Sequence, residues 1–264
     1  MGLGSPSGDR WKKKNMVFNH FDQFEIIRII PFHPFGNLDI SITNSTIFMA
    51  TAVGSFYALS RLERGYIVPT RWQSIIEVVY ETVHNMVKEN IGSTSDKTRF
   101  FPIIFVLFVF LALMNMFGLV PYTFTPTSHI VVTFGLSLSI FIACTIIGFN
   151  TYKLDFFAMF MPAGAPLWLA PFLVIIEFIS HGAKAISLGV RLAANITAGH
   201  LLFAILSGFT WNMITAGGLI TIVSIFPLFI VLFITVLEMA VALIQAYVFC
   251  LLTTIYINDS VNLH

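Results

Sequence analysis

Long runs of apolar residues, separated by short polar segments, dominate this chain. The first run, residues 43–60, is barely as long as the ~20 residues that a helix needs to cross a bilayer. Residues 100–149 contain two stronger runs, which Pro121 and Pro126 separate. Because proline is not accommodated in a helix interior, these two runs predict a helical hairpin that crosses the membrane twice.

Residues 70–91 have a different pattern. Apolar positions such as Val79, Val83 and Met86 recur there at helical spacing, while charged residues fall mostly on the other side. A helix with one apolar and one polar face is typical of a membrane surface. We therefore expect this segment to lie on the bilayer rather than to cross it.

Residues 167–257 hold two apolar stretches, joined around Gly217 and Gly218, that are too long for upright helices. A run of about 40 residues is roughly 60 Å long as a helix, against a hydrocarbon core of ~30 Å. Neither stretch contains a proline beyond Pro171 and Pro227, respectively, and neither contains polar turns. The pattern favours a long, steeply tilted antiparallel hairpin over four short crossings.

Composition supports a membrane protein. Of 264 residues, 57% are hydrophobic and only 10% are charged, with a mean hydropathy of +0.86, whereas soluble domains carry about 25% charged residues. The net charge of +1 argues against nucleic acid as a partner. Cys144 and Cys250 lie in apolar runs, so we expect them to pack as small hydrophobic residues rather than to pair with each other or bind a metal. No cofactor is expected.

These patterns predict an all-α integral membrane protein with about five transmembrane helices and one amphipathic surface helix. A single membrane domain covers residues 21–264. Residues 1–20 form a polar, basic N-terminal segment that is either a leader or an extension. Basic residues between the first span and the hairpin place that loop inside, with the N-terminus outside and the C-terminus inside.

Polar residues inside the long stretches need a specific explanation, because charge in a membrane is costly and tends to mark an ion path. At ~100° per residue, one side of the first long helix carries a polar stripe. The second long helix has a similar series, spaced by seven and fourteen residues. The two sets are Glu177, His181, Lys184, Arg191 and Asn195, and Glu238, Gln245 and Asp259.

Folding the two helices about Gly218 predicts three polar levels. Glu177 faces Asp259 near one surface, Arg191 faces Gln245 midway, and His200 faces Glu238 toward the other surface. Proton-accepting residues would then lie at both ends of the helix pair, with a cation between them. This arrangement is typical of two half-channels that a charged barrier separates. Arginine suits the barrier because its guanidinium stays protonated, whereas a lysine could release its proton.

Simpler interpretations stay open for several of these residues. Lys184 could extend its charge to the membrane surface, and His181 could pack or bond locally to Glu177. Asn195 and Gln245 could be ordinary interhelical hydrogen-bonding residues. Arg191 could form an internal salt bridge with Glu238.

The segment Ser187–Asn195, followed by Ala198-Gly199-His200, resembles subunit a of rotary ATP synthases. Further matching segments run in the same order from about residue 21 to the end. They are Asp22-Gln23-Phe24-Glu25-Ile26, Pro121-Tyr122-Thr123-Phe124-Thr125, Pro162-Ala163-Gly164-Ala165-Pro166, Leu237-Glu238, Gln245-Ala246-Tyr247-Val248-Phe249, Tyr256-Ile257-Asn258-Asp259 and Asn262-Leu263-His264.

The resemblance implies that Arg191 faces the carboxylate of a rotating c-ring, with Asn195 and Gln245 as polar neighbours. It assigns His200 and Glu238 to the outer half-channel, and Glu177 and Asp259 to the inner one. Histidine before glutamate is similar to the mitochondrial and alphaproteobacterial branch. Lys184 and His181-Gly182 depart from the expected pattern.

The family's partners are the ring of c subunits, the peripheral stalk, other membrane subunits and lipid. Its location is the mitochondrial inner membrane, or the inner membrane of an alphaproteobacterium. Nucleotide chemistry is not expected, because the chain lacks a G-x-x-x-x-G-K-S/T pattern. The rival hypothesis is a self-contained proton-coupled transporter or a proton-pumping respiratory subunit, for which internal repeats would be expected.

Overall fold

The computed structural model describes residues 26–30, 41–62, 70–91, 94–120, 123–153, 169–218, 221 and 223–261. The N-terminal segment 1–20 and the turn at 162–166 lie outside these residues. So do most of the motif at 22–26, the start of the motif at 121–125 and the last three residues.

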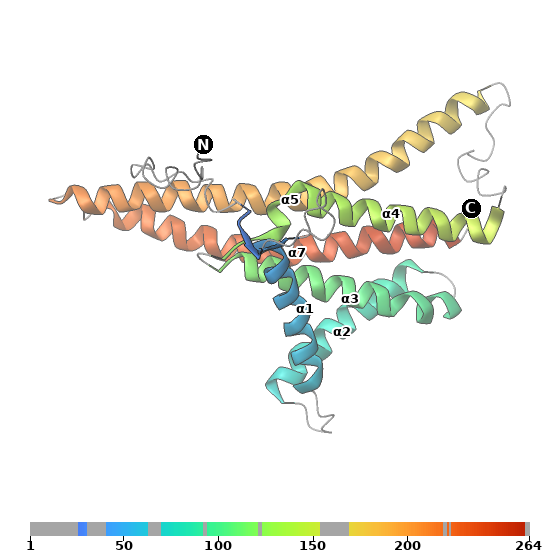
Figure 1. The fold of residues 1–264 in the computed structure, drawn as a ribbon, viewed down its shortest axis with the longest axis horizontal. Coiled ribbons are helices and arrows are strands. Elements are labelled where there is room, and N and C mark those ends of the chain that lie inside the picture. The colour runs from blue at the N-terminus through green and yellow to red at the C-terminus, as the bar shows by residue number, and fades with distance from the viewer. Residues whose placement is uncertain are drawn as a thin grey trace, which may run out of the picture.

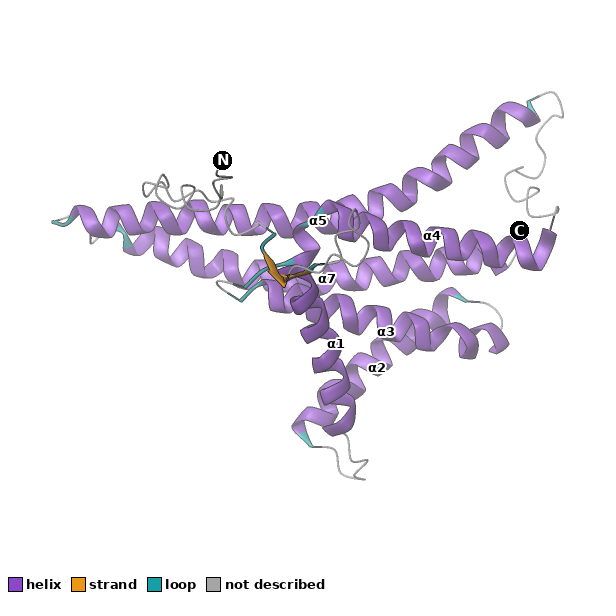
Figure 2. Cartoon of the chain, viewed as in Figure 1, coloured by secondary structure: helices purple, strands orange, loops and turns teal. Residues whose placement is uncertain are grey.

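Within the described residues the chain is almost entirely helical (Figures 1 and 2), which confirms the all-α class. A 3-10 turn, η2 (Pro126–Ser128), lies between α3 and α4. Strands β1 (Arg28–Ile30) and β2 (Ile42–Thr43) form a small antiparallel pair that the sequence did not predict. The helices are α1 (Asn44–Leu62), α2 (Arg71–Asn90), α3 (Thr94–Gly118), α4 (Ile130–Tyr152), α5 (Ala170–Ala216) and α7 (Ile225–Val261).

Four helices in the described part of the chain are long and apolar enough to cross a membrane: α3, α4, α5 and α7. Helix α1 occupies the predicted first span with 19 residues, but it is not among the four. Threonines and serines interrupt its apolar residues. The fifth crossing therefore stays a prediction, whereas the multi-pass membrane protein is confirmed.

Each of the two longest stretches forms one helix, as predicted (Figure 1). Helix α5 has 47 residues and α7 has 37, which correspond to roughly 70 and 55 Å. A bilayer core of ~30 Å holds such helices only if they run obliquely. Helix α7 begins several residues later than the sequence suggested, and Pro227 falls in its first turn, where a missing amide proton costs nothing.

Glycine makes the reversal between the long helices possible. Gly217 and Gly218 both have positive φ angles, of 71° and 68°. Residues with a side chain seldom adopt this conformation. The two glycines end α5 where the sequence analysis placed the turn.

Helix α2 has the predicted two-sided character. Val83, Met86 and Val87 are buried and belong to the same hydrophobic cluster as residues of α3. Its acidic residues, Glu77, Glu81 and Glu89, are exposed. At its start, the Thr70 side chain accepts a hydrogen bond from the Gln73 amide at 3.4 Å.

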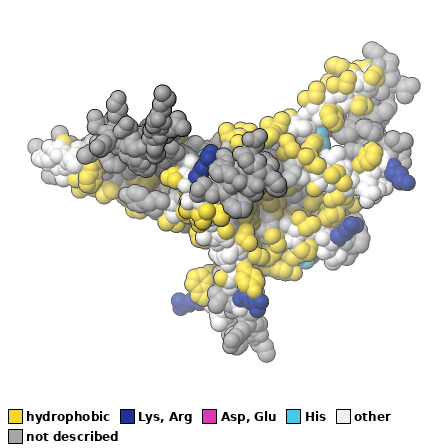
Figure 3. Space-filling model, in the orientation of Figure 1, with side chains coloured by type: hydrophobic (Ala, Val, Ile, Leu, Met, Phe, Trp, Pro, Cys, Tyr) yellow, Lys and Arg dark blue, Asp and Glu magenta, His cyan; other side chains and the backbone are white. Residues whose placement is uncertain are grey.

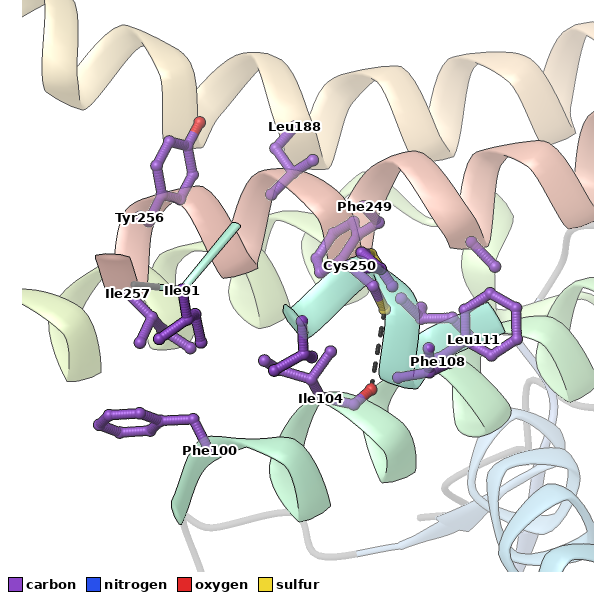
Figure 4. Close-up of a cluster of buried hydrophobic side chains, with 14 of the residues drawn as sticks. Ile91, Phe100, Ile104, Phe108, Leu111, Leu188, Phe249, Cys250, Tyr256 and Ile257 are labelled. Carbon is purple, nitrogen blue, oxygen red and sulfur yellow. Dashed lines mark hydrogen bonds between the residues drawn. The ribbon is translucent and has the colours of Figure 1, made fainter. Parts of the chain in front are cut away.

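The core lies where α3, α5 and α7 meet the end of α2 (Figure 4). Both cysteines are free and buried, as small hydrophobic residues would be. The Cys250 thiol approaches the Ile104 carbonyl at 4.0 Å. Polar bonds add to this packing. The Tyr152 hydroxyl of α4 donates to the Val261 carbonyl of α7, and the Asn115 amide of α3 donates to the Ala242 carbonyl of α7 at 3.1 Å.

The outer surface is largely apolar. On the face in Figure 3, hydrophobic side chains predominate and basic ones are few. Large apolar side chains, including Phe172, Phe178, Phe226 and Phe229, are more than half exposed. Surfaces of this kind are stable against lipid or other membrane subunits rather than water.

Candidate proton-translocation site

The antiparallel contact between α5 and α7 brings the predicted polar residues together. The Asn195 side-chain amide donates to the Gln245 amide oxygen at 2.9 Å. Asn195 is exposed, whereas Gln245 is buried. The bond fixes the register of the two helices midway along their length.

This register differs by about one turn from the predicted pairing of Arg191 with Gln245. The physical reason is that side chains lean toward the N-terminus of their own helix. In an antiparallel pair the side chains of the two helices therefore point in opposite directions along the bundle. As a result, two side chains that touch belong to residues further toward the C-terminus of each helix than the residues whose Cα atoms lie opposite one another. Gln245 therefore meets Asn195, four residues after Arg191.

Toward the Gly217–Gly218 turn, Glu238 packs against α5 beside His200. A methyl group placed on Gly199 would lie 2.4 Å from Oε1 of Glu238 and 2.7 Å from its Cδ. Only a glycine leaves room for the carboxyl group in this position. The structure therefore places Glu238 against Gly199, the residue before His200, and the facing of His200 and Glu238 stays a prediction.

A loop between α3 and α4 completes this end. The His200 Nε2 atom lies 3.1 Å from the Thr125 hydroxyl, and Thr197 donates to the Ser128 carbonyl at 3.2 Å. The loop also contains His129, whose ring stacks on Phe124 with centroids 5.2 Å apart. Helix α5 is therefore attached to η2 on both sides of Gly199.

Several polar atoms of this region are buried without a hydrogen-bond partner among the described residues. Buried polar groups are normally paired or hydrated, so atoms of this kind indicate a polar interior that can bind water or exchange protons. They are Asn115 Oδ1, Thr127 Oγ1, His129 Nε2, Glu238 Oε1 and Gln245 Nε2.

At the opposite end, the His181 ring packs beside two aromatic rings. Its ring lies 5.9 Å from the Tyr256 ring and 5.3 Å from that of Phe141, centroid to centroid. The charges of Glu177 and Asp259 both reach it electrostatically. Glu177 is exposed and Asp259 is half-buried.

An open cleft of about 460 Å³ lies between α5 and α7. In Figure 1 the first part of α5 diverges from α4 and α7, and the cleft residues of α5 begin in this part. The lining residues are Ser180, Ala183, Lys184, Ser187, Arg191, Leu252, Ile255 and Tyr256.

Arg191 lines this cleft and is exposed. The Tyr256 hydroxyl is within its electrostatic range. The Glu238 carboxyl group lies against Gly199, eight residues or about 12 Å further along α5. This separation argues against the internal salt bridge between Arg191 and Glu238.

The exposed side of α5 around Arg191 consists mainly of small residues. Ala183, Ser187, Ala194 and Ala198 are exposed and, with Arg191 between them, follow one another at intervals of three or four residues. Small side chains let a second helix come close in a membrane. We call these four residues the small-residue face of α5.

Sequence reasoning missed three residues of the site. Tyr256 follows Gln245 by eleven residues, just over three full turns, so it shares the polar stripe of α7. Asn115 is the one polar side chain in the apolar run 100–120. Thr125 had no such signal, because it lies in a loop. Among the described residues, no group of three His, Cys, Asp or Glu side chains could hold a metal ion.

Comparison with known proteins identifies the family. The family described as ATP synthase A chain matches residues 42–258. The chain belongs to this family.

Several relatives match over nearly their whole length. "ATP synthase subunit a" of Marchantia polymorpha is 49% identical over 253 residues, which cover 94% of this chain and all of that protein. The protein of the same name from Metridium senile is 50% identical over 93% of this chain and 98% of its own length. That of Chondrus crispus is 45% identical, covering 94% and 98%.

Membership in the ATP synthase A chain family settles the general role. The chain is a multi-pass membrane component of ATP synthase that serves proton transport and works together with the other subunits of the complex.

Proposed function

We propose that this chain is the stator half of a rotary proton path, in which two offset half-channels open against a rotating ring of c subunits. Glu238 and His200 line the outer half-channel. Glu177 and Asp259 line the inner one. Arg191 separates the two, and the chain itself catalyses no chemical reaction.

The arrangement along α5 is the main support for this proposal. Glu177 precedes Arg191 by fourteen residues, about 21 Å, and His200 follows it by nine, about 13 Å. Proton-accepting groups thus occur both before and after Arg191 along α5, and Arg191 itself is exposed and lines the cleft between α5 and α7. The buried unpaired oxygen of Glu238 supports a polar passage at one end.

The small-residue face supports a partner helix at Arg191. A ring helix carrying a carboxylate can approach the backbone of α5 along this face, because its alanine and serine side chains are small. Arg191 projects from the middle of this face, between Ser187 and Ala194. Its charge would meet the carboxylate at close range in an environment with little water.

The electrostatics of the cycle follow from these positions. A proton that enters past Glu238 and His200 neutralises a ring carboxylate, and a neutral acid enters lipid far more cheaply than an anion. After nearly a full turn, the acid releases its proton toward Glu177 and Asp259 and passes Arg191 as an anion. A membrane potential supplies ~2.3 kcal/mol per charge per 100 mV to drive this rotation.

The location and assembly are proposals as well. The order of His200 before Glu238 resembles the mitochondrial and alphaproteobacterial branch, so we infer the mitochondrial inner membrane or an equivalent bacterial one. The peripheral stalk would hold the chain still against the ring.

The test is coupled ATP synthesis in membranes that contain Arg191 variants. We expect Arg191→Ala to abolish synthesis, and Arg191→Lys to reduce it severely because a lysine can lose its proton. The matched control is Ser187→Ala, one turn away in the same cleft, which should retain synthesis. Wild-type synthesis in Arg191→Ala, in fully assembled complexes, would overturn the proposal.

A further inference from the structure

Thr125 is buried, with 2% of its surface exposed, and it contacts the ring of His200. Its Oγ1 lies 3.1 Å from Nε2 of His200 and 3.2 Å from the carbonyl oxygen of Gly118. One hydroxyl group therefore joins the end of α3 to the middle of α5.

The direction of these hydrogen bonds follows from the chemistry of the three groups. A carbonyl oxygen can only accept, so the single hydroxyl proton of Thr125 is donated to Gly118. The hydroxyl oxygen must then accept from His200, which requires a proton on Nε2.

The position of Thr125 does not depend on the histidine. A methyl group placed on Gly118 would lie 2.4 Å from Cγ2 of Thr125, so the side chain is packed tightly onto that glycine. On its other side, the Ser128 hydroxyl donates to the Thr125 carbonyl at 2.7 Å. Thr197 in turn binds Ser128, and the loop is held against α5.

We propose that Thr125 is a positioning residue, which fixes the orientation and the tautomer of His200. With the Nε2 proton held by Thr125, the neutral ring keeps its lone pair on Nδ1. Nδ1 is then the nitrogen that takes up and releases a proton. This inference rests on the proposed role of His200 in the outer half-channel.

The experiment compares Thr125→Val with Thr125→Ser in the assembled complex. Valine has the shape of threonine without the hydroxyl, whereas serine keeps the hydroxyl. With the catalytic head removed, we expect passive proton conduction to fall about 2- to 10-fold in Thr125→Val, as for the loss of one net hydrogen bond. Thr125→Ser should conduct within twofold of wild type.

A spectroscopic measurement separates positioning from simple packing. In ¹⁵N-histidine-labelled complexes, with the His200 signal assigned by its loss in His200→Gln, the wild-type ring should show a protonated Nε2 and an unprotonated Nδ1. Thr125→Val should show a mixture of tautomers. This measurement on the wild type and on Thr125→Ser remains decisive even if the valine variant fails to assemble.

Three results would overturn the inference: wild-type conduction in an assembled Thr125→Val, equal losses in the valine and serine variants, or a wild-type His200 protonated on Nδ1. Failure of the proposed function is distinguishable. It would appear as wild-type conduction in His200→Gln, whatever the tautomer of the wild-type ring.

Discussion

Replacing Gly199 by alanine tests the link between helix packing and proton transfer. The new methyl group would lie 2.4 Å from Oε1 of Glu238, whereas ordinary contacts begin near 3.4 Å. The carboxyl group must therefore recede by about 1 Å. It is the end of a flexible side chain, so it can rotate off its rotamer at a cost of about 0.5–1.5 kcal/mol, and the helix itself need not move.

A barrier raised by this amount slows proton transfer through Glu238 about 2- to 10-fold. We expect passive proton conduction and ATP synthesis to fall by this factor in Gly199→Ala. Assembly and thermal stability should stay close to wild type. The measurement is proton conduction in membranes stripped of the catalytic head, normalised to the amount of assembled complex.

Gly135→Ala is the matched control, because a methyl group on this helical glycine of α4 meets nothing within 4 Å. It should conduct as wild type. If Gly199→Ala did so too, the Glu238 carboxyl group would have no role in the proton path, and this reasoning would be refuted.

Two further predictions concern stability. A methyl group on Gly189 would meet the Phe134 Cα at 2.9 Å and the Thr133 carbonyl at 3.0 Å. Because backbone atoms cannot rotate away, Gly189→Ala should force α4 and α5 apart and lower the stability of the folded chain by about 1–3 kcal/mol. We expect a lower melting temperature, and an unchanged melting temperature would contradict this packing. Burial lowers the pKa of His129 below its ordinary value of 6.5. As the pH drops through about 6.5, the unfolded chain therefore binds a proton before the folded chain does, and stability should fall. His129→Phe keeps an aromatic ring beside Phe124 and should weaken this acid sensitivity in thermal melts from pH 5 to 8, whereas a pH dependence identical to that of wild type would contradict the prediction.

The architecture of the long hairpin was predictable because it depends on properties that a single sequence displays. Uninterrupted apolar length predicted one helix for each stretch, and Gly217-Gly218 predicted the reversal. Helical periodicity also predicted polar residues along the facing sides of the two helices, and Glu238 does lie against Gly199, the residue before His200. The pairing of Glu177 with Asp259 stays a prediction. The first residues of α7 were less predictable, since the apolar residues after Gly218 continue without a polar signal.

The remaining features depend on contacts that no periodicity encodes. The meeting of Gln245 with Asn195 follows from the lean of side chains, which shifts a pairing by a turn. Thr125 reaches His200 because a loop folds back onto α5, and loop geometry is not readable from hydrophobic pattern. The pairing of β1 with β2 likewise joins two short segments that show no strand signal.

The barrier role of Arg191 is the central claim, and passive proton permeability tests it most directly. Membranes without the catalytic head are energised by a potassium diffusion potential, and proton flux is followed in Arg191→Ala and in Ser187→Ala. If a permanent cation separates two polar passages, Arg191→Ala should leak protons while driving no ATP synthesis, and Ser187→Ala should behave as wild type. Arg191→Ala membranes that stay proton-tight, or that leak yet still synthesise ATP, would contradict the account.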